Sequence, residues 1–97
     1  MGNSYVQPEI VLTILSNDRE NVRVGVAASR SVGNAVKRNR ARRRIRAIIN
    51  QYLPRIKPGW DIVIIARRSI HRASPDRLKT VINNLLTLAE LFKEVGG

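Results

Sequence analysis

Two segments in the first part of the chain have the residue patterns of β-strands. Residues 9–16 are rich in β-branched side chains, and in residues 22–29 Val and Ala alternate with small or polar residues. Both patterns are typical of β-strands. Because only the five polar residues 17–21 separate the two segments, we expect them to form a β-hairpin. Residues 4–6, just before Pro8, could add a short edge strand.

The period changes to that of a helix after Asn34, which is a favourable N-cap. Apolar residues then recur at helical spacing to residue 52 or 53, and this pattern predicts one long helix with a buried stripe. The stripe contains Ala41, Ile45, Ile48, Ile49, Tyr52 and Leu53.

The rest of the chain predicts one strand and one helix. Residues 60–66 are an almost unbroken apolar run, which is typical of a central strand covered on both faces. Residues 67–73 are expected to form a loop. Ser74, Pro75 and Asp76 are favourable residues for a helix start, and the helical spacing continues to about Val95, before two terminal glycines.

This order of elements predicts an α+β fold and a single domain over residues 1–97. We expect a two-layer sandwich, in which helices pack on a mostly antiparallel sheet of about four strands. Residues 22–66 form a βαβ unit, for which the general rule predicts a right-handed crossover. The chain has no cysteine, so neither disulfides nor thiolate metal sites contribute. With no long apolar span and no secretory signal pattern, a soluble cytoplasmic protein is expected.

The positive charge is concentrated in one part of the chain. The formal net charge is +11, and residues 21–60 contain no Asp or Glu. Outside this window the basic and acidic residues balance. Seven of the ten residues 37–46 are Lys or Arg. Charge of one sign in one segment indicates a polyanionic partner, and nucleic acid is favoured over an anionic membrane because the apolar stripe is needed for the core.

The basic helix is poorly suited to be an ordinary solvated helix. Its first turn places cations at the positive end of the helix dipole, and Arg38–Arg42 and Arg40–Arg44 are like-charge pairs at i,i+4 spacing. Arg40, Arg43 and Arg44 are expected to project away from the core. Arginine also suits bidentate contacts with phosphates. The residues alone leave open whether the partner is RNA or DNA.

Residues 32–46, Val-Gly-Asn-Ala-Val-Lys-Arg-Asn-Arg-Ala-Arg-Arg-Arg-Ile-Arg, closely resemble the signature of the bacterial ribonuclease P protein subunit. The hallmark of that family is the Arg-Asn-Arg element, here Arg38-Asn39-Arg40. The segments 23–30 and 61–67 resemble the family in order and spacing. The resemblance covers roughly residues 10–91.

The resemblance implies a small basic partner of a large catalytic RNA. The RNA would carry the active site and its Mg²⁺ ions, and the assembly would remove the 5′ leader of precursor tRNA. The protein would bind no cofactor or metal itself and would hold the single-stranded leader beside the sheet. The resemblance also implies a left-handed βαβ crossover, which we expect here in place of the right-handed default. The predicted RNA-binding residues, from the resemblance and the charge together, are Arg30, Lys37, Arg38, Asn39, Arg40, Arg42, Arg43, Arg44, Arg46 and Arg67.

The sequence departs from the family pattern at several positions. Ala41 stands where a larger aliphatic residue is usual, Ser31 where a second basic residue is usual, and Thr13 where an aromatic residue often helps to bind the leader. The family's usual N-terminal helix, which lines the leader cleft, is expected to be missing before Gly2. Its absence would put leader binding in doubt, expose sheet surface and favour dimers.

Catalysis by the protein alone is not expected. The single histidine, His71, is predicted to be solvated in its loop, and Asp61 and Asp76 are predicted to be turn and cap residues. Trp60 is predicted to pack. Arg67, Arg68 and Arg72 form a small secondary basic patch, for which helix capping or solvation is favoured over RNA contact. The alternative function is a general nucleic-acid-binding module, similar to a ribosomal protein or a DNA reader, without a processing role.

Overall fold

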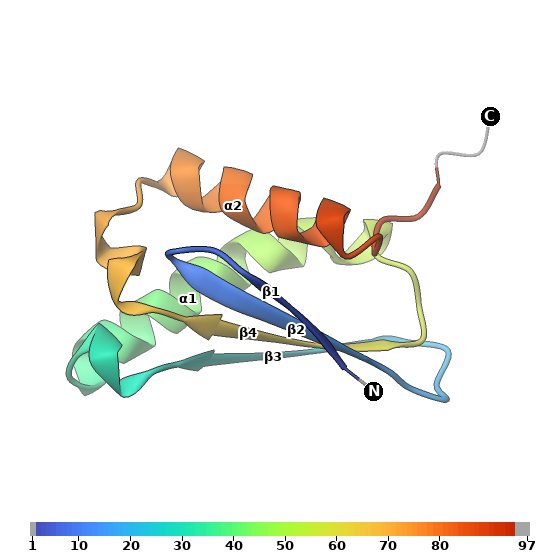
Figure 1. Ribbon diagram of the computed structural model, residues 1–97, viewed down its shortest axis with the longest axis horizontal. Helices are drawn as coiled ribbons and strands as arrows, with labels where there is room; N and C mark the ends of the chain where they lie inside the picture. The colour runs from blue at the N-terminus through green and yellow to red at the C-terminus, as the bar shows by residue number, and fades with distance from the viewer. Residues whose placement is uncertain (1, 95–97) are drawn as a thin grey trace.

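The protein consists of a four-stranded sheet with both α-helices packed on the same face (Figure 1). The structure, a computed structural model, describes residues 2–94. The two-layer α+β prediction is therefore confirmed. The main elements are β1 (Asn3–Val6), β2 (Ile10–Ser16), β3 (Val22–Ala28), α1 (Ala35–Tyr52), β4 (Trp60–Ala66) and α2 (Pro75–Leu88), and the short 3₁₀ helices are η1 (Arg30–Val32), η2 (Leu53–Arg55) and η3 (Arg68–Arg72).

The predicted β2–β3 hairpin is wrong. The strand order is β1-β2-β4-β3, so β4 lies between β2 and β3 and pairs with both, antiparallel with β2 and parallel with β3. The hairpin in this sheet is β1–β2 instead. The apolar run of β4 explains the difference, because the strand with the most apolar side chains gains most from a central position with a neighbour on each edge.

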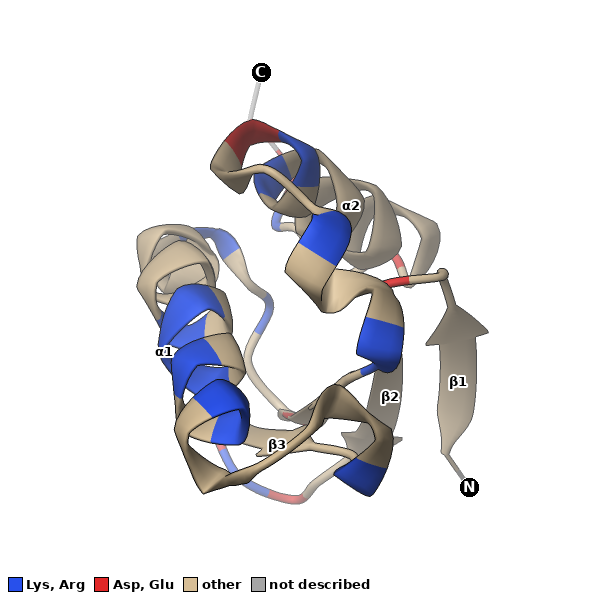
Figure 2. Ribbon diagram, turned by 90° about the vertical axis from the view of Figure 1, so that its left-hand side faces the viewer, with Lys and Arg blue, Asp and Glu red and all other residues tan. Residues whose placement is uncertain are grey.

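The connection from β3 through α1 to β4 is left-handed, as the resemblance implies. Figure 1 shows β3 and β4 pointing the same way, and Figure 2 looks along them with β3 at the left edge of the sheet and α1 above it. By the strand order, β4 lies to the right of β3 in that view, between β3 and β2. The chain moves towards the viewer along β3, returns along α1, and enters β4 to the right, which is a left-handed path. Gly33 turns the chain into α1 at φ 134° and ψ −149°, a conformation essentially restricted to glycine.

One hydrophobic core fills the space between the sheet and the helices. It is formed by alternate residues of the strands, by the predicted stripe of α1 and by one face of α2. In α1 the most buried residues are Ala41, Ile45, Ile49 and Tyr52. Both predicted N-caps are confirmed: the side chain of Asn34 accepts a hydrogen bond from the Lys37 N–H, and that of Ser74 accepts one from the Arg77 N–H. No helix within residues 2–94 is long and apolar enough to cross a membrane.

The second face of the sheet carries no helix, contrary to the prediction that β4 is covered on both faces. Ile62, Ile64 and Ala66 of β4 are buried, whereas Val63 is 41 % exposed. We call this helix-free side the open sheet face. Its residues from β2, β3 and β4 include Val11, Thr13, Leu15, Gly25, Ala27, Val63 and Ile65.

The second helix ends earlier than its apolar spacing predicts. α2 stops at Leu88, because Glu90 adopts φ 56° and the chain turns back. The Leu91 N–H donates to the Leu86 carbonyl and the Glu90 N–H to the Thr87 carbonyl, which is the pattern of a Schellman motif. The chain then forms a bridge between Phe92 and Ile56 of the segment after α1. The predicted end at residues 95–97 lies outside the described residues.

Candidate nucleic-acid interface

Helix α1 has one face in the core and one face covered with guanidinium groups. Exposed along it are Lys37, Arg40, Arg43 and Arg46, while Arg38 and Arg42 are partly buried. Figure 2 shows the Lys and Arg positions grouped along the visible side of α1. The helix has no acidic residue in its first turn, so the Asn34 cap and the buried stripe stabilise it against the repulsion between its cations.

Within residues 2–94, none of these cations forms an ion pair. The two salt bridges found there join Arg23 to Asp61 and Arg77 to Glu9, both outside α1. A surface helix normally gains a few tenths of a kcal/mol from each Glu–Lys pair at i,i+4 spacing. Helix α1 lacks this gain, and the guanidinium groups of Arg40, Arg43 and Arg46 in particular remain available to bind an anion.

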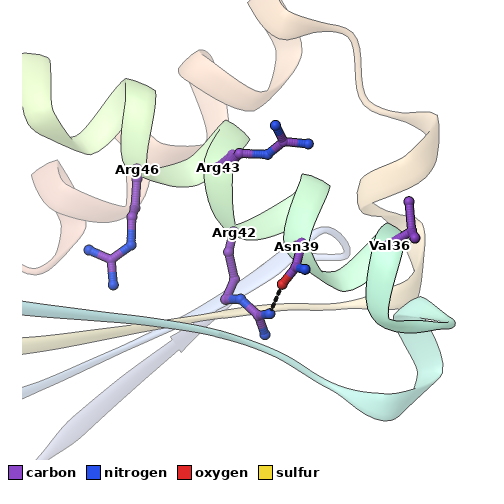
Figure 3. A pocket seen from close by; sticks show the side chains of 5 residues that line it. All are labelled: Val36, Asn39, Arg42, Arg43 and Arg46. Carbon is purple, nitrogen blue, oxygen red and sulfur yellow. Dashed lines mark hydrogen bonds between the residues drawn. The ribbon is translucent and has the colours of Figure 1, made fainter.

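Part of this basic surface is a hollow on the side of α1 that faces the edge strand β3 (Figure 3). The hollow has a volume of about 600 Å³ and is lined by Val36, Asn39, Arg42, Arg43 and Arg46. Arg42 and Arg46 reach down towards the sheet, whereas Arg43 points away from the sheet on the upper edge of the hollow. The Asn39 Oδ1 accepts a hydrogen bond from Arg42, so the amide nitrogen of Asn39 stays free to donate to a ligand.

Arg44 does not project away from the core as the helical spacing predicts. Its guanidinium group is partly buried and donates to two carbonyl oxygens of the segment before α2, to Ile70 O at 2.9 Å and to Ala73 O at 2.5 Å. These two hydrogen bonds explain why the Arg44 side chain turns towards η3 and not towards solvent, because they satisfy the carbonyl groups of Ile70 and Ala73. Arg44 therefore holds η3 against α1.

The other two predicted RNA-binding residues lie outside α1. Arg30 begins η1 and is exposed. Arg67 follows β4, and its guanidinium group donates to the Gln7 carbonyl at 3.0 Å, near the β1–β2 turn. The structure therefore groups the α1 residues on one surface and places Arg67 apart from them.

His71 is not simply solvated. Although its side chain is exposed, Nε2 lies 2.6 Å from the Val32 carbonyl. A carbonyl oxygen accepts only, so Nε2 carries the proton in this contact. His71 therefore links η3 to η1, the turn that leads into α1. Sequence reasoning missed this contact because Val32 and His71 are 39 positions apart.

Sequence reasoning also missed a polar cluster at one end of the sheet. Arg23 and Asp61 are paired residues of the parallel strands β3 and β4, and the Arg23 Nε and Nη2 donate to the two Asp61 oxygens at 2.8 and 2.6 Å. Asn17 donates to the same carboxylate at 2.7 Å. The hydrogen bonds from Arg23 and then Asn17 lower the pKa of Asp61 to about 2. Asp61 is thus a cross-strand ion-pair residue and not a turn residue. Only the strand pairing could have revealed it.

Three comparisons identify what the chain is similar to. The family model for "Ribonuclease P" matches residues 1–90. A protein from Herpetosiphon aurantiacus named "Ribonuclease P protein component" is 30 % identical over 93 residues, which are 96 % of this chain and 76 % of that protein. A protein of the same name from Streptococcus pneumoniae is 31 % identical over 96 residues, or 99 % of this chain and 78 % of the relative.

The fold comparison gives the same result. The Staphylococcus aureus RNase P protein superposes with a TM-score of 0.83 at 27 % identity, covering 95 % of this chain and 84 % of the other. The RNase P protein of Thermotoga maritima gives a TM-score of 0.79 at 27 % identity, covering 90 % and 83 %.

Proposed function

This chain belongs to the family of bacterial ribonuclease P protein subunits, and we propose that α1 binds the phosphate backbone of the RNA subunit and that the assembly removes the 5′ leader of precursor tRNA in the cytoplasm. The proposed contact residues are basic and amide residues of α1, together with Arg30 before the helix and Arg67, which lies apart from it. They are Arg30, Lys37, Arg38, Asn39, Arg40, Arg42, Arg43, Arg46 and Arg67, with Arg44 positioning η3 from within the same run. The alternative, a general nucleic-acid module without a processing role, receives no support from the comparisons.

The observation that carries the proposal is the unpaired arginine face of α1. A rigid helix presents guanidinium groups along one side, and no carboxylate within residues 2–94 forms an ion pair with them. Guanidinium groups form paired hydrogen bonds with phosphate oxygens, and the counterions released from RNA add to the affinity. The fixed spacing along α1 then selects a backbone of matching shape.

We assign the chemistry to the RNA and not to this protein. The side chains on the proposed contact surface are cations and amides, whereas Mg²⁺ requires oxygen ligands such as carboxylates and phosphates. Mg²⁺ would therefore enter the assembly on RNA phosphates. The protein's part is to neutralise backbone charge and to hold RNA segments in place.

The open sheet face is the place we propose for the single-stranded leader. Its middle part is low and mostly apolar, with Gly25 and Ala27 on β3, while the Arg23–Asp61 ion pair lies at one end of it. A Cβ atom added at Gly25 would meet nothing within 4 Å. Backbone and base can therefore approach this strand closely. The Arg42 and Arg46 side chains extend from α1 towards the same strand. Because α1 lies on the opposite face of the sheet, these guanidinium groups would meet phosphates of a leader that follows the outer edge of β3, while its bases contact the open sheet face.

The same face would also be buried if two copies of the chain formed a dimer. Val63 and Leu15 are 41 % and 46 % exposed there, and apolar surface of this kind favours self-association. The leader and a second copy of the chain would then compete for the open sheet face. A dimer seen by sedimentation should dissociate when a single-stranded RNA leader is added, and a leader-independent dimer would place the self-contact elsewhere.

The direct test is the double substitution Arg38→Ala with Arg40→Ala. If about five phosphates are neutralised, the logarithm of RNA affinity should fall with the logarithm of salt at a slope between roughly −3.5 and −4.5, and the variant's slope should be less steep. Thermal unfolding should be unchanged, since neither residue belongs to the core. Precursor-tRNA cleavage by the family's RNA at low Mg²⁺ should be stimulated by the wild-type chain and much less by the variant.

Two results would contradict the proposal. An unchanged RNA affinity in the double variant would place the interface away from α1. Absence of stimulation by the wild-type chain, with a full-length relative active in parallel, would show that this chain does not assist cleavage.

A further inference from the structure

The short helix η3 presents a second basic site, separate from the exposed side of α1. Arg68 and Arg72 are exposed and line a hollow of about 390 Å³ together with Ser69 and His71. Ile70 between them is fully buried and anchors the segment in the core. The hollow therefore has two guanidinium groups and a hydroxyl group at its wall, all of which can donate hydrogen bonds to an anion.

This site is held in a fixed position relative to α1. Arg44 donates from the middle of α1 to the carbonyls of Ile70 and Ala73, and His71 donates to the Val32 carbonyl in the turn before α1. Three hydrogen bonds thus join η3 to α1 and η1. A ligand bound to α1 would meet η3 at a defined distance and with little ordering cost.

The charges of η3 are also unneutralised. Among residues 2–94, neither Arg68 nor Arg72 forms a salt bridge or a side-chain hydrogen bond, and the buried Glu9 nearby is engaged by Arg77. Figure 2 shows basic positions on α1 and on the segment that leads into α2, at the same end of the molecule. The two groups of cations therefore face solvent around one end of the sheet.

We propose that η3 is a second binding site for RNA backbone, in which Arg68 and Arg72 contact phosphates of the same RNA that binds α1. The inference rests on the proposed function and extends it to residues outside the Arg-Asn-Arg helix. A membrane surface fits less well, because Ile70 is buried and η3 exposes no apolar side chain that could enter lipid. A protein partner fits less well because the hollow offers no apolar anchor.

The test is Arg68→Gln with Arg72→Gln, with the RNA subunit of a bacterial ribonuclease P as the probe. Removing one guanidinium–phosphate interaction should reduce the salt slope by about 1. Loss of both arginines should therefore reduce the salt slope by about 2. With that difference in slope, the ratio of wild-type to variant affinity becomes roughly 16-fold smaller when the salt rises from 50 to 200 mM. The matched control is Arg19→Gln with Lys93→Gln, two exposed cations in the β2–β3 loop and in the segment after α2. Both segments lie at the end of the molecule opposite η3 (Figure 1). The control should leave both affinity and slope close to wild type.

The outcomes separate this inference from the proposed function. If the η3 variant binds like wild type while Arg38→Ala with Arg40→Ala weakens binding, η3 is not an RNA site and the role of α1 stands. If neither variant weakens binding, the proposed function itself fails. If the control loses as much affinity as the η3 variant, the effect is one of net charge and the site is refuted. Circular dichroism and thermal unfolding of each variant should match wild type, because both arginines are exposed and unbonded.

Discussion

Arg43 and Arg44 are neighbours in the basic run, but their side chains lie in different surroundings, and we expect them to have different roles. Arg43 is exposed and lines the hollow beside α1, whereas Arg44 is partly buried and donates to two carbonyls of the segment before α2. We expect Arg44→Met to destabilise the fold and Arg43→Met to weaken RNA binding. Methionine keeps the aliphatic length in both cases and removes only the guanidinium group.

The magnitude for Arg44→Met follows from the hydrogen bonds that the substitution removes. The Ile70 carbonyl keeps a second donor, the Ala73 N–H at 3.1 Å, so it stays satisfied. The Ala73 carbonyl loses its charged donor, and such bonds contribute about 1.5–3 kcal/mol. Relief of the repulsion between Arg40 and Arg44 returns a few tenths of a kcal/mol. A net loss of about 2 kcal/mol should lower Tm by roughly 8–16 °C in a domain of this size.

Urea and thermal unfolding without RNA measure the stability of both variants, and RNA titration at a temperature where both are folded measures affinity. Arg43→Met should unfold within about 0.5 kcal/mol of wild type, and its RNA affinity should fall more than that of Arg44→Met. The assignment fails if Arg44→Met is as stable as wild type and binds RNA as weakly as Arg43→Met. That result would make Arg44 an RNA ligand and its bonds to η3 incidental.

Three further substitutions test the backbone and the cross-strand ion pair. Gly33→Ala should cost about 1–3 kcal/mol in urea unfolding, because the φ of 134° excludes other residues and the new Cβ would lie 2.8 Å from the Lys37 Cδ; stability equal to wild type would refute the assigned conformation. Glu90→Gly should raise stability by about 1 kcal/mol, since glycine adopts the φ of 56° without strain; a loss of stability would show that the side chain matters more than the turn. The pKa of Asp61 is lowered from 3.8 to about 2, so its pairing with Arg23 stabilises the fold above pH 3.8 and is lost as the pH falls towards 2. Asp61→Asn should flatten this part of a urea-midpoint profile against pH, and an unchanged profile would exclude Asp61 as its cause.

The local elements could be predicted from the sequence because their signals are local. The Asn34 cap, the period of Ile45 and Ile49, and the β-branched run of β2 each lie within a few residues of what they determine. The basic face of α1 followed from the same period, since positions opposite a buried stripe must face solvent. These inferences required no knowledge of strand order.

The strand order could not be predicted in this way. A five-residue polar turn between two strands favours a hairpin locally, but the alternative pairing with β4 joins residues far apart in the sequence, such as Ile14 with Ile62 and Val24 with Ile62. No local pattern in the sequence shows which of these two strand pairings is more stable. The continuous apolar run of β4 correctly indicated a central strand, but it did not show that only one face would be covered by helices.

The basic run shows why charge alone cannot assign roles within a binding helix. By helical spacing Arg40, Arg43 and Arg44 should be equivalent, and only the position of η3 distinguishes them. That position depends on the path of the chain after β4, because the Ile70 and Ala73 carbonyls reach Arg44 only if η3 turns back over α1. The same bonds that hold the Arg44 guanidinium group against the Ile70 and Ala73 carbonyls fix η3, which carries Arg68 and Arg72, next to α1. In the proposed arrangement one arginine of the motif positions two others outside it, and the proposed RNA-binding surface is therefore larger than the motif itself.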